Sequence, residues 1–205
     1  MNAAGVFGAL GTVVGLVRAL PQLFRLLKTR DAHGVSLDSA TTSSIVSFGW
    51  ATYGALTDQL AVTLATGSSG IVFALISLLA LKRGRRLPEL RTAPVWLVVL
   101  VVSTLLWQAD GLGVLLPVSV LVANVPQLVV AYRETDLRGL SVSTWVLSVC
   151  DGVVWAVYAL VTGDVAILVF GLLQLTTSGA IVARRLAWGR VNRTRTTDPE
   201  LKARS

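Results

Sequence analysis

Two charged residues lie inside long apolar stretches of this chain, Arg18 in the first stretch and Asp151 in the sixth. An ionisable side chain in a membrane span is costly, and is usually paired or functional. Arg18 is nine residues before the end of its expected span, and Asp151 is nine residues after the start of its own. Because the two helices run in opposite directions, both residues lie at the same depth from one side of the membrane, roughly 13 Å at 1.5 Å per residue. Equal depth permits an ion pair, which is either purely structural or a site where Asp151 binds a solute or takes a proton. Asn124 has a similar depth and is a candidate third member of this cluster.

Two tryptophans, Trp50 and Trp155, each lie about two turns before the C-terminal end of their expected span. They are therefore on the other side of the membrane from the ends nearest to Arg18 and Asp151. Interfacial tryptophans are common in membrane proteins, but they lie nearer the span ends, as expected for Trp96. An indole offers a flat apolar face together with one N–H donor. We therefore predict that Trp50 and Trp155 contact a small solute.

Two Pro-Gln pairs, Pro21-Gln22 and Pro126-Gln127, occur within apolar stretches. A proline inside a helix removes a backbone hydrogen bond and favours a kink. The two pairs are candidate hinges of a gate, and the alternative is a static bend that improves packing.

The elements that position these residues are membrane-spanning helices. The chain has 205 residues, of which 54% are hydrophobic and only 14% charged, whereas soluble domains carry about 25% charged residues. The mean hydropathy is +0.71. Apolar stretches of spanning length predict an all-α integral membrane protein with seven transmembrane helices. The predicted spans are Gly5–Leu27, Asp38–Leu56, Leu60–Leu81, Ala93–Trp107, Leu112–Tyr132, Val142–Val161 and Asp164–Val182.

The second span is the most polar, with Thr41, Thr42, Ser43 and Ser44 in a row. Such a helix is expected inside a bundle or beside water, where its hydroxyl groups find partners.

Basic residues alternate from loop to loop, and they follow the first, third, fifth and seventh spans. Because positive residues stay in the cytoplasm, we expect the N-terminus outside and the C-terminus inside. The pI of about 10.5 is then explained by topology, and no nucleic-acid partner is predicted. The polar tail from Arg190 is expected to lack regular structure and to be a solvated charged segment, and the alternative is that its arginines contact anionic membrane lipid.

The chain contains an internal repeat with an offset of 105 residues and no gap. The offset aligns the Pro-Gln pairs, and also Gly34 with Gly139, Ser36 with Ser141, Trp50 with Trp155, and Tyr53 with Tyr158. Shared membrane composition would align leucines and valines but would not keep these rarer residues in one register. The serines are expected to cap the helices that follow them, and His33 is expected to be solvated.

Each repeat has three spans, so one extra helix is needed to give both repeats the same orientation. The predicted organisation is 3+1+3, two parallel three-helix repeats with a linker helix. The predicted domains are a first repeat over 1–86, a linker helix over 87–110, a second repeat over 111–186, and a basic cytoplasmic tail over 187–205.

On these motifs the chain resembles the PQ-loop superfamily, and within it the SWEET and SemiSWEET sugar transporters, whose halves are parallel repeats. The resemblance implies alternating-access movement of a small solute between the repeats, without a cofactor. It also implies that Trp50 and Trp155 flank the solute and that Pro21 and Pro126 bend.

The resemblance also implies a solute-facing asparagine in the third helix of each repeat, where this chain has Thr66 and Gly171. Gln174 lies one turn beyond Gly171 and is a candidate substitute. The predicted solute-binding residues are therefore Trp50, Trp155, Asn124, Thr66 and Gln174.

Three functions remain open. The first is a transporter of a mono- or disaccharide by facilitated diffusion. The second is a proton-coupled transporter of an amino acid or other charged metabolite, favoured by Arg18 and Asp151. The third is a seven-helix receptor, chaperone or scaffold that transports nothing.

An enzyme is not expected, because one histidine and one cysteine offer no nucleophile set and no metal site. The expected location is a bacterial inner (plasma) membrane, and a homo-oligomer is left open.

Overall fold

A computed structural model describes residues 3–32, 35–134, 137 and 140–197, with side chains described as far as 189. His33, Gly34 and Gly139 lie outside the described residues. The elements are α1 (Ala3–Thr29), α2 (Leu37–Leu56), α3 (Leu60–Lys82), η1 (Leu87–Glu89), α4 (Thr92–Arg133), α5 (Val142–Thr162) and α6 (Val165–Thr197).

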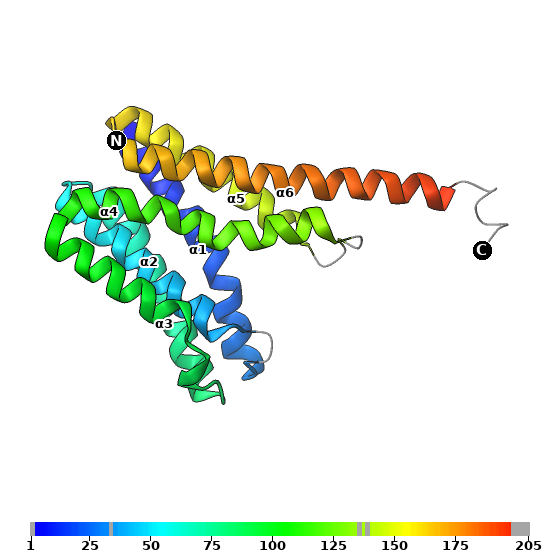
Figure 1. Ribbon diagram of the computed structural model, residues 1–205, viewed down its shortest axis with the longest axis horizontal. Coiled ribbons are helices and arrows are strands. Elements are labelled where there is room, and N and C mark those ends of the chain that lie inside the picture. Colours follow the sequence, from blue (N-terminus) through cyan, green and yellow to red (C-terminus); the bar gives the residue numbers. More distant parts are fainter. Residues whose placement is uncertain (1–2, 33–34, 135–136, 138–139, 198–205) are drawn as a thin grey trace.

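The described part of the chain has six α-helices, and the expected fourth and fifth spans both lie in α4. Its backbone leaves helical geometry at Gln108, where φ is 48° and ψ is −126°. The direction of α4 changes there (Figure 1). A separate loop was expected between these spans, but a single residue in the left-handed region makes the turn.

Five helices are long and apolar enough to cross a membrane: α1, α3, α4, α5 and α6. Helix α2 carries the polar stretch noted above. The hydroxyl of Ser44 donates to the Gly70 carbonyl at 3.0 Å, and that of Thr41 donates to Ser77 at 3.2 Å. The bundle therefore satisfies part of the polarity of α2, as its sequence predicts.

Helix packing follows the 105-residue offset. Helix α3 packs against α1 and α2, and α6 packs correspondingly against α4 and α5. Between these groups, α1 contacts α5 and α4 contacts α2. The 105-residue offset aligns α1 with the second part of α4 and α2 with α5, so the two contacts are equivalent in the two repeats. This is the pattern that two three-helix units related by a two-fold axis produce.

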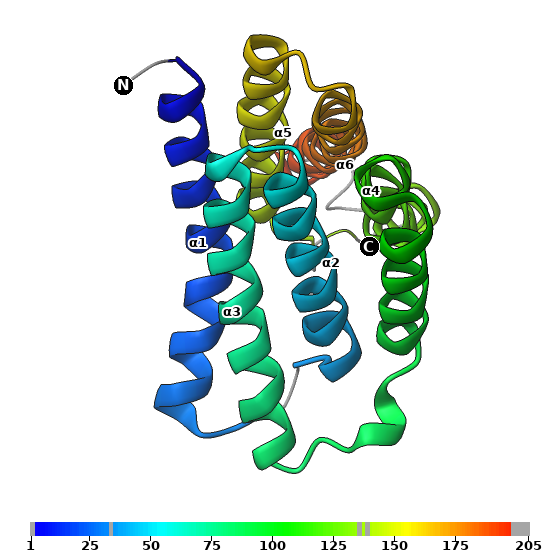
Figure 2. The same ribbon diagram turned by 90° about the vertical axis from the view of Figure 1, so that its left-hand side faces the viewer.

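The two groups of helices converge at one end, near the α2–α3 and α5–α6 turns, and diverge from there (Figure 1). Helices α1, α3 and α2 lie side by side in one group (Figure 2).

Both predicted serine caps are present. Ser36 accepts a hydrogen bond from the Ser39 N–H at 3.2 Å, and Ser141 accepts one from the Thr144 N–H at 3.4 Å. The expectation for the tail was wrong in part, since α6 continues as far as Thr197.

Candidate solute-binding site

A cavity of about 480 Å³ lies between the two groups of helices and is lined by residues from all six α-helices. It runs from the first turns of α2 and α4, at Asp38, Ser39 and Thr92, to the indoles of Trp50 and Trp155. Small-molecule sites usually have volumes of roughly 300–1,000 Å³. The cavity is therefore the right size for a small solute.

The two tryptophans form the deep end of the cavity, and each is 6% exposed. Trp50 packs edge-on against Tyr53 with ring centroids 5.6 Å apart, and Trp155 packs against Tyr158 at 5.5 Å. The indole of Trp155 also lies directly on Gly11 of α1, where an added Cβ would come within 2.6 Å of the ring.

The indole N–H of Trp50 is buried and finds no hydrogen-bond partner among the described residues. A buried donor without a partner is costly. A solute oxygen in the cavity would satisfy it.

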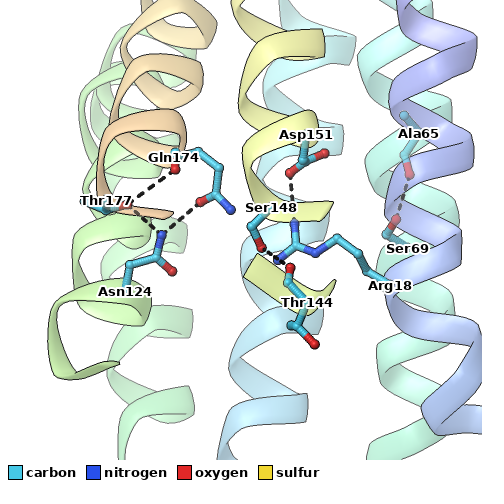
Figure 3. Close-up of polar contacts among 9 residues, drawn as sticks. All are labelled: Arg18, Ala65, Ser69, Asn124, Thr144, Ser148, Asp151, Gln174 and Thr177. Carbon is cyan, nitrogen blue, oxygen red and sulfur yellow. Dashed lines mark hydrogen bonds and ion pairs between the residues drawn. The ribbon is translucent and has the colours of Figure 1, made fainter. Parts of the chain in front are cut away.

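Arg18 and Asp151 form the ion pair that their equal depth permits. Nη1 of Arg18 donates to Oδ2 of Asp151 at 2.9 Å, and both residues line the cavity (Figure 3). The Arg18 side chain is 37% exposed, and that of Asp151 is 6% exposed. The carboxylate is thus held in the wall while the guanidinium remains open to the cavity.

Asn124 joins a second polar group rather than the ion pair. Its Nδ2 donates to Oε1 of Gln174 at 3.2 Å and to Oγ1 of Thr177 at 2.8 Å. This group comes from α4 and α6, whereas the ion pair comes from α1 and α5 (Figure 3). Asn124 and Gln174 both line the cavity, so two polar walls of different chemistry face it.

Beyond the tryptophans the bundle is closed by Asp164, whose Oδ2 accepts two hydrogen bonds. The Tyr53 hydroxyl donates at 2.8 Å and Nε2 of Gln59 donates at 2.6 Å. The other oxygen, Oδ1, accepts the Ile167 N–H at the start of α6, at 2.9 Å. A small apolar pocket of about 30 Å³ is lined by both tryptophans and Ile167.

This arrangement of helices has a solved counterpart. The structure of a eukaryotic SWEET transporter matches this chain with a TM-score of 0.71, over 92% of this chain and 100% of that one. The chain has the SWEET transporter fold. Sequence identity in the match is 14%, and neither a family model nor a curated protein sequence matches the chain.

Within the SWEET fold, the two positions expected to hold asparagine have different environments here. Thr66 lines the cavity, and its hydroxyl donates to the Val62 carbonyl of its own helix at 2.7 Å. Gly171 instead packs against the backbone of α5, where an added Cβ would lie 2.7 Å from the Ala156 nitrogen. Position 171 has no room for any side chain, so Gln174 supplies the amide on this side of the cavity.

The two Pro-Gln pairs differ in position. Pro126 and Gln127 line the cavity, and Pro21 and Gln22 are not among its lining residues. Pro21 lies inside α1 and Pro126 inside α4, and the departure from helical geometry in α4 occurs at Gln108 instead. Both helices therefore continue through their prolines in this conformation.

Several residues of the site were not predicted from the sequence. Trp96 was expected at the membrane interface, but it is 9% exposed and lines the cavity. Phe170 packs on Trp50 with ring centroids 5.2 Å apart. The closing contacts to Asp164 were also missed, although the 105-residue offset aligns Asp164 with Gln59 and signals that they could meet.

Proposed function

We propose that this chain is an alternating-access transporter that moves a mono- or disaccharide by facilitated diffusion. The SWEET fold supports transport of a small solute as the general function. The choice of a sugar rests on the chemistry of the cavity.

The observation that carries the proposal is the difference between the two ends of the cavity. One end reaches the first turns of α2 and α4, and the other is blocked by Trp50, Trp155 and the contacts to Asp164. A path closed at one end and accessible at the other is one state of an alternating-access cycle. The distribution of basic residues among the loops supports a cytoplasmic location for the accessible end.

The lining suits a sugar, which has hydroxyl groups at its edges and apolar ring faces. The indoles offer flat apolar surfaces, and the Trp50 N–H is an unused donor. Hydroxyls of α2, including Thr42, Ser43 and Ser47, and the amides of Asn124 and Gln174 surround the same space.

The proposal includes the halves of the molecule as its moving parts. The first repeat (1–86) and the second (111–186), joined by a linker (87–110), would be related by an axis along the membrane normal and would rock against each other. The Pro21-Gln22 and Pro126-Gln127 segments would serve as hinges at the cytoplasmic side. The resulting topology has seven spans, with α4 crossing twice.

The test is uptake of labelled glucose and sucrose into proteoliposomes that contain the purified protein. We expect saturable uptake of at least one sugar, reduced tenfold or more in the Trp50→Ala and Trp155→Ala variants. Trp107→Ala is the matched control, because Trp107 is 61% exposed and outside the cavity. Folded protein without sugar flux would contradict the proposal.

The ion pair of Arg18 and Asp151 favours a second candidate, proton-coupled transport of an amino acid or other charged metabolite. A carboxylate that lines the cavity could carry the proton. Facilitated diffusion predicts that an imposed pH gradient drives no accumulation of solute above equilibrium. Accumulation that is abolished by Asp151→Asn would select the second candidate instead.

A further inference from the structure

We propose that Arg18 and Asp151 form a subsite that binds two adjacent hydroxyl groups of the transported solute. The inference rests on the sugar-transport function proposed above and adds the part of the sugar that is recognised. It also assigns a binding role to the Arg18–Asp151 ion pair, because transport of a neutral solute does not by itself require charged residues in the cavity wall.

The first argument is the hydrogen-bonding capacity that the pair retains. Arginine has five N–H donors and a carboxylate has about four acceptor positions. The ion pair uses one contact between Nη1 and Oδ2, and a hydrogen bond from the Trp155 side chain uses one further acceptor position of Asp151. The Arg18 side chain is 37% exposed, and Arg18 lines the cavity. Donors and acceptors therefore remain side by side, which matches the acceptor and donor of two neighbouring hydroxyl groups.

The second argument is charge. The pair is neutral as a unit, so an anion that approaches Arg18 is opposed by Asp151, and a cation that approaches Asp151 is opposed by Arg18. Neutral hydroxyl groups meet no such opposition, and hydrogen bonds to charged partners are stronger than those between neutral groups.

The third argument is position. Trp155 lies one helical turn from Asp151 on α5, and both line the cavity. A sugar ring against the indole would therefore bring its edge to the carboxylate. The repeat counterparts of Arg18 and Asp151 are Ala123 and Val46, which have no polar side-chain atoms, so only one wall can bind hydroxyl groups in this way.

The experiment compares glucose with monodeoxyglucoses that each lack one hydroxyl, as inhibitors of labelled-glucose uptake by proteoliposomes. In the unmodified protein, loss of either of two adjacent hydroxyls should weaken inhibition roughly tenfold or more, as expected for a hydrogen bond to a charged group. The subsite would be overturned, in the unmodified protein alone, if inhibition were weakened by loss of a single hydroxyl, by loss of hydroxyls that are not adjacent, or by loss of none.

The second arm uses the double variant Arg18→Met with Asp151→Leu, which removes both charges and leaves neither partner unpaired. Glucose loses both contacts and should then bind about a hundredfold more weakly, at about tenfold for each contact. Each of the two critical deoxyglucoses loses its one remaining contact and should bind about tenfold more weakly, so that discrimination falls to within about twofold. Asp110→Asn, which changes an exposed carboxylate outside the cavity, should behave like the unmodified protein.

A purely structural ion pair would give a different result, because all sugars would lose affinity equally in the double variant. That outcome would overturn the subsite and leave sugar transport intact. Folded, unmodified protein with no saturable glucose or sucrose uptake would overturn the proposed function and this inference with it.

Discussion

Gln59 and Asp164 are separated by the 105-residue offset of the internal repeat, and they are hydrogen-bonded to each other at 2.6 Å. Two residues that occupy equivalent places in two related units can touch only near the axis that relates the units. The contact therefore marks where the two halves meet, at the closed end of the cavity. Tyr53 donates to the same carboxylate oxygen, which makes Asp164 the centre of the closure.

Removing the Tyr53 hydroxyl should weaken this closure while leaving the ring packing in place. We expect Tyr53→Phe to shift the population toward a state opened at this end, because a hydrogen bond to a carboxylate contributes about 1.5–3 kcal/mol. The measurement is the distance between spin labels at Thr57→Cys and Thr162→Cys in a Cys150→Ser background. The control is Tyr158→Phe, which removes the counterpart hydroxyl, and equal distance distributions in both variants would contradict the prediction.

Gly171 gives a prediction about restoring asparagine. Gly171→Asn should prevent correct packing of α6 on α5, since an added Cβ would lie 2.7 Å from the Ala156 nitrogen and 2.9 Å from the Gly152 carbonyl oxygen. Thr66→Asn should be tolerated, because Thr66 faces the cavity. Size-exclusion chromatography in detergent should show loss of the monodisperse peak for the first variant only, and a well-folded Gly171→Asn protein would refute the packing argument.

Asp38 on α2 forms the N-terminal cap of α4. Its Oδ1 accepts from the backbone N–H groups of Arg91 at 2.9 Å, Thr92 at 3.0 Å and Ala93 at 3.0 Å. Asp38→Ala should lower the free energy of unfolding by about 0.5–2 kcal/mol, the usual cost of losing a cap.

The loss should appear as a lower midpoint in thermal unfolding of the detergent-solubilised protein. Asp38→Asn should retain part of the stability because the amide oxygen still accepts. Asp110→Ala serves as the control for a lost exposed carboxylate, and a loss as large as that of Asp38→Ala would disprove the capping role.

The hinge role predicts an effect on rate rather than on affinity. Pro21→Ala and Pro126→Ala should each reduce maximal sugar uptake severalfold with little change in the half-saturating concentration, because alanine restores a backbone donor and stiffens the helix. Pro117→Ala is the comparison, since the repeat counterpart of Pro117 is Thr12. Unchanged uptake in both hinge variants would favour the static bend.

Much of the fold follows from local features of the sequence. Ser36 and Ser141 cap their helices because a serine oxygen before the first turn accepts from a backbone N–H that has no partner within the helix. The fourth and fifth spans were expected to separate between Trp107 and Leu112, and the helix leaves helical geometry within this interval, at Gln108. The loop expected there is replaced by one residue, because Gln108 adopts a positive φ that is uncommon for a residue other than glycine. Its positive φ depends on tertiary packing, which a single sequence does not display.

The site was predicted unevenly for a similar reason. Arg18 and Asp151 stood out because charge is rare in apolar stretches, and Trp50 and Trp155 stood out because the repeat aligned them. Trp96 was placed at the interface because depth was measured along a single helix. Its burial comes from the packing of α4 against α2, a relationship between distant segments.

The two polar walls of the cavity have a consequence for how a solute is oriented. A site built from two identical copies of one repeat would present each residue twice, and a bound molecule could turn through half a revolution and fit equally well. In the repeat alignment, Arg18 and Asp151 correspond to Ala123 and Val46, and Asn124 corresponds to Ala19. Joining two diverged halves in one polypeptide removes that degeneracy, so the proposed site would hold a solute without internal symmetry in one preferred pose.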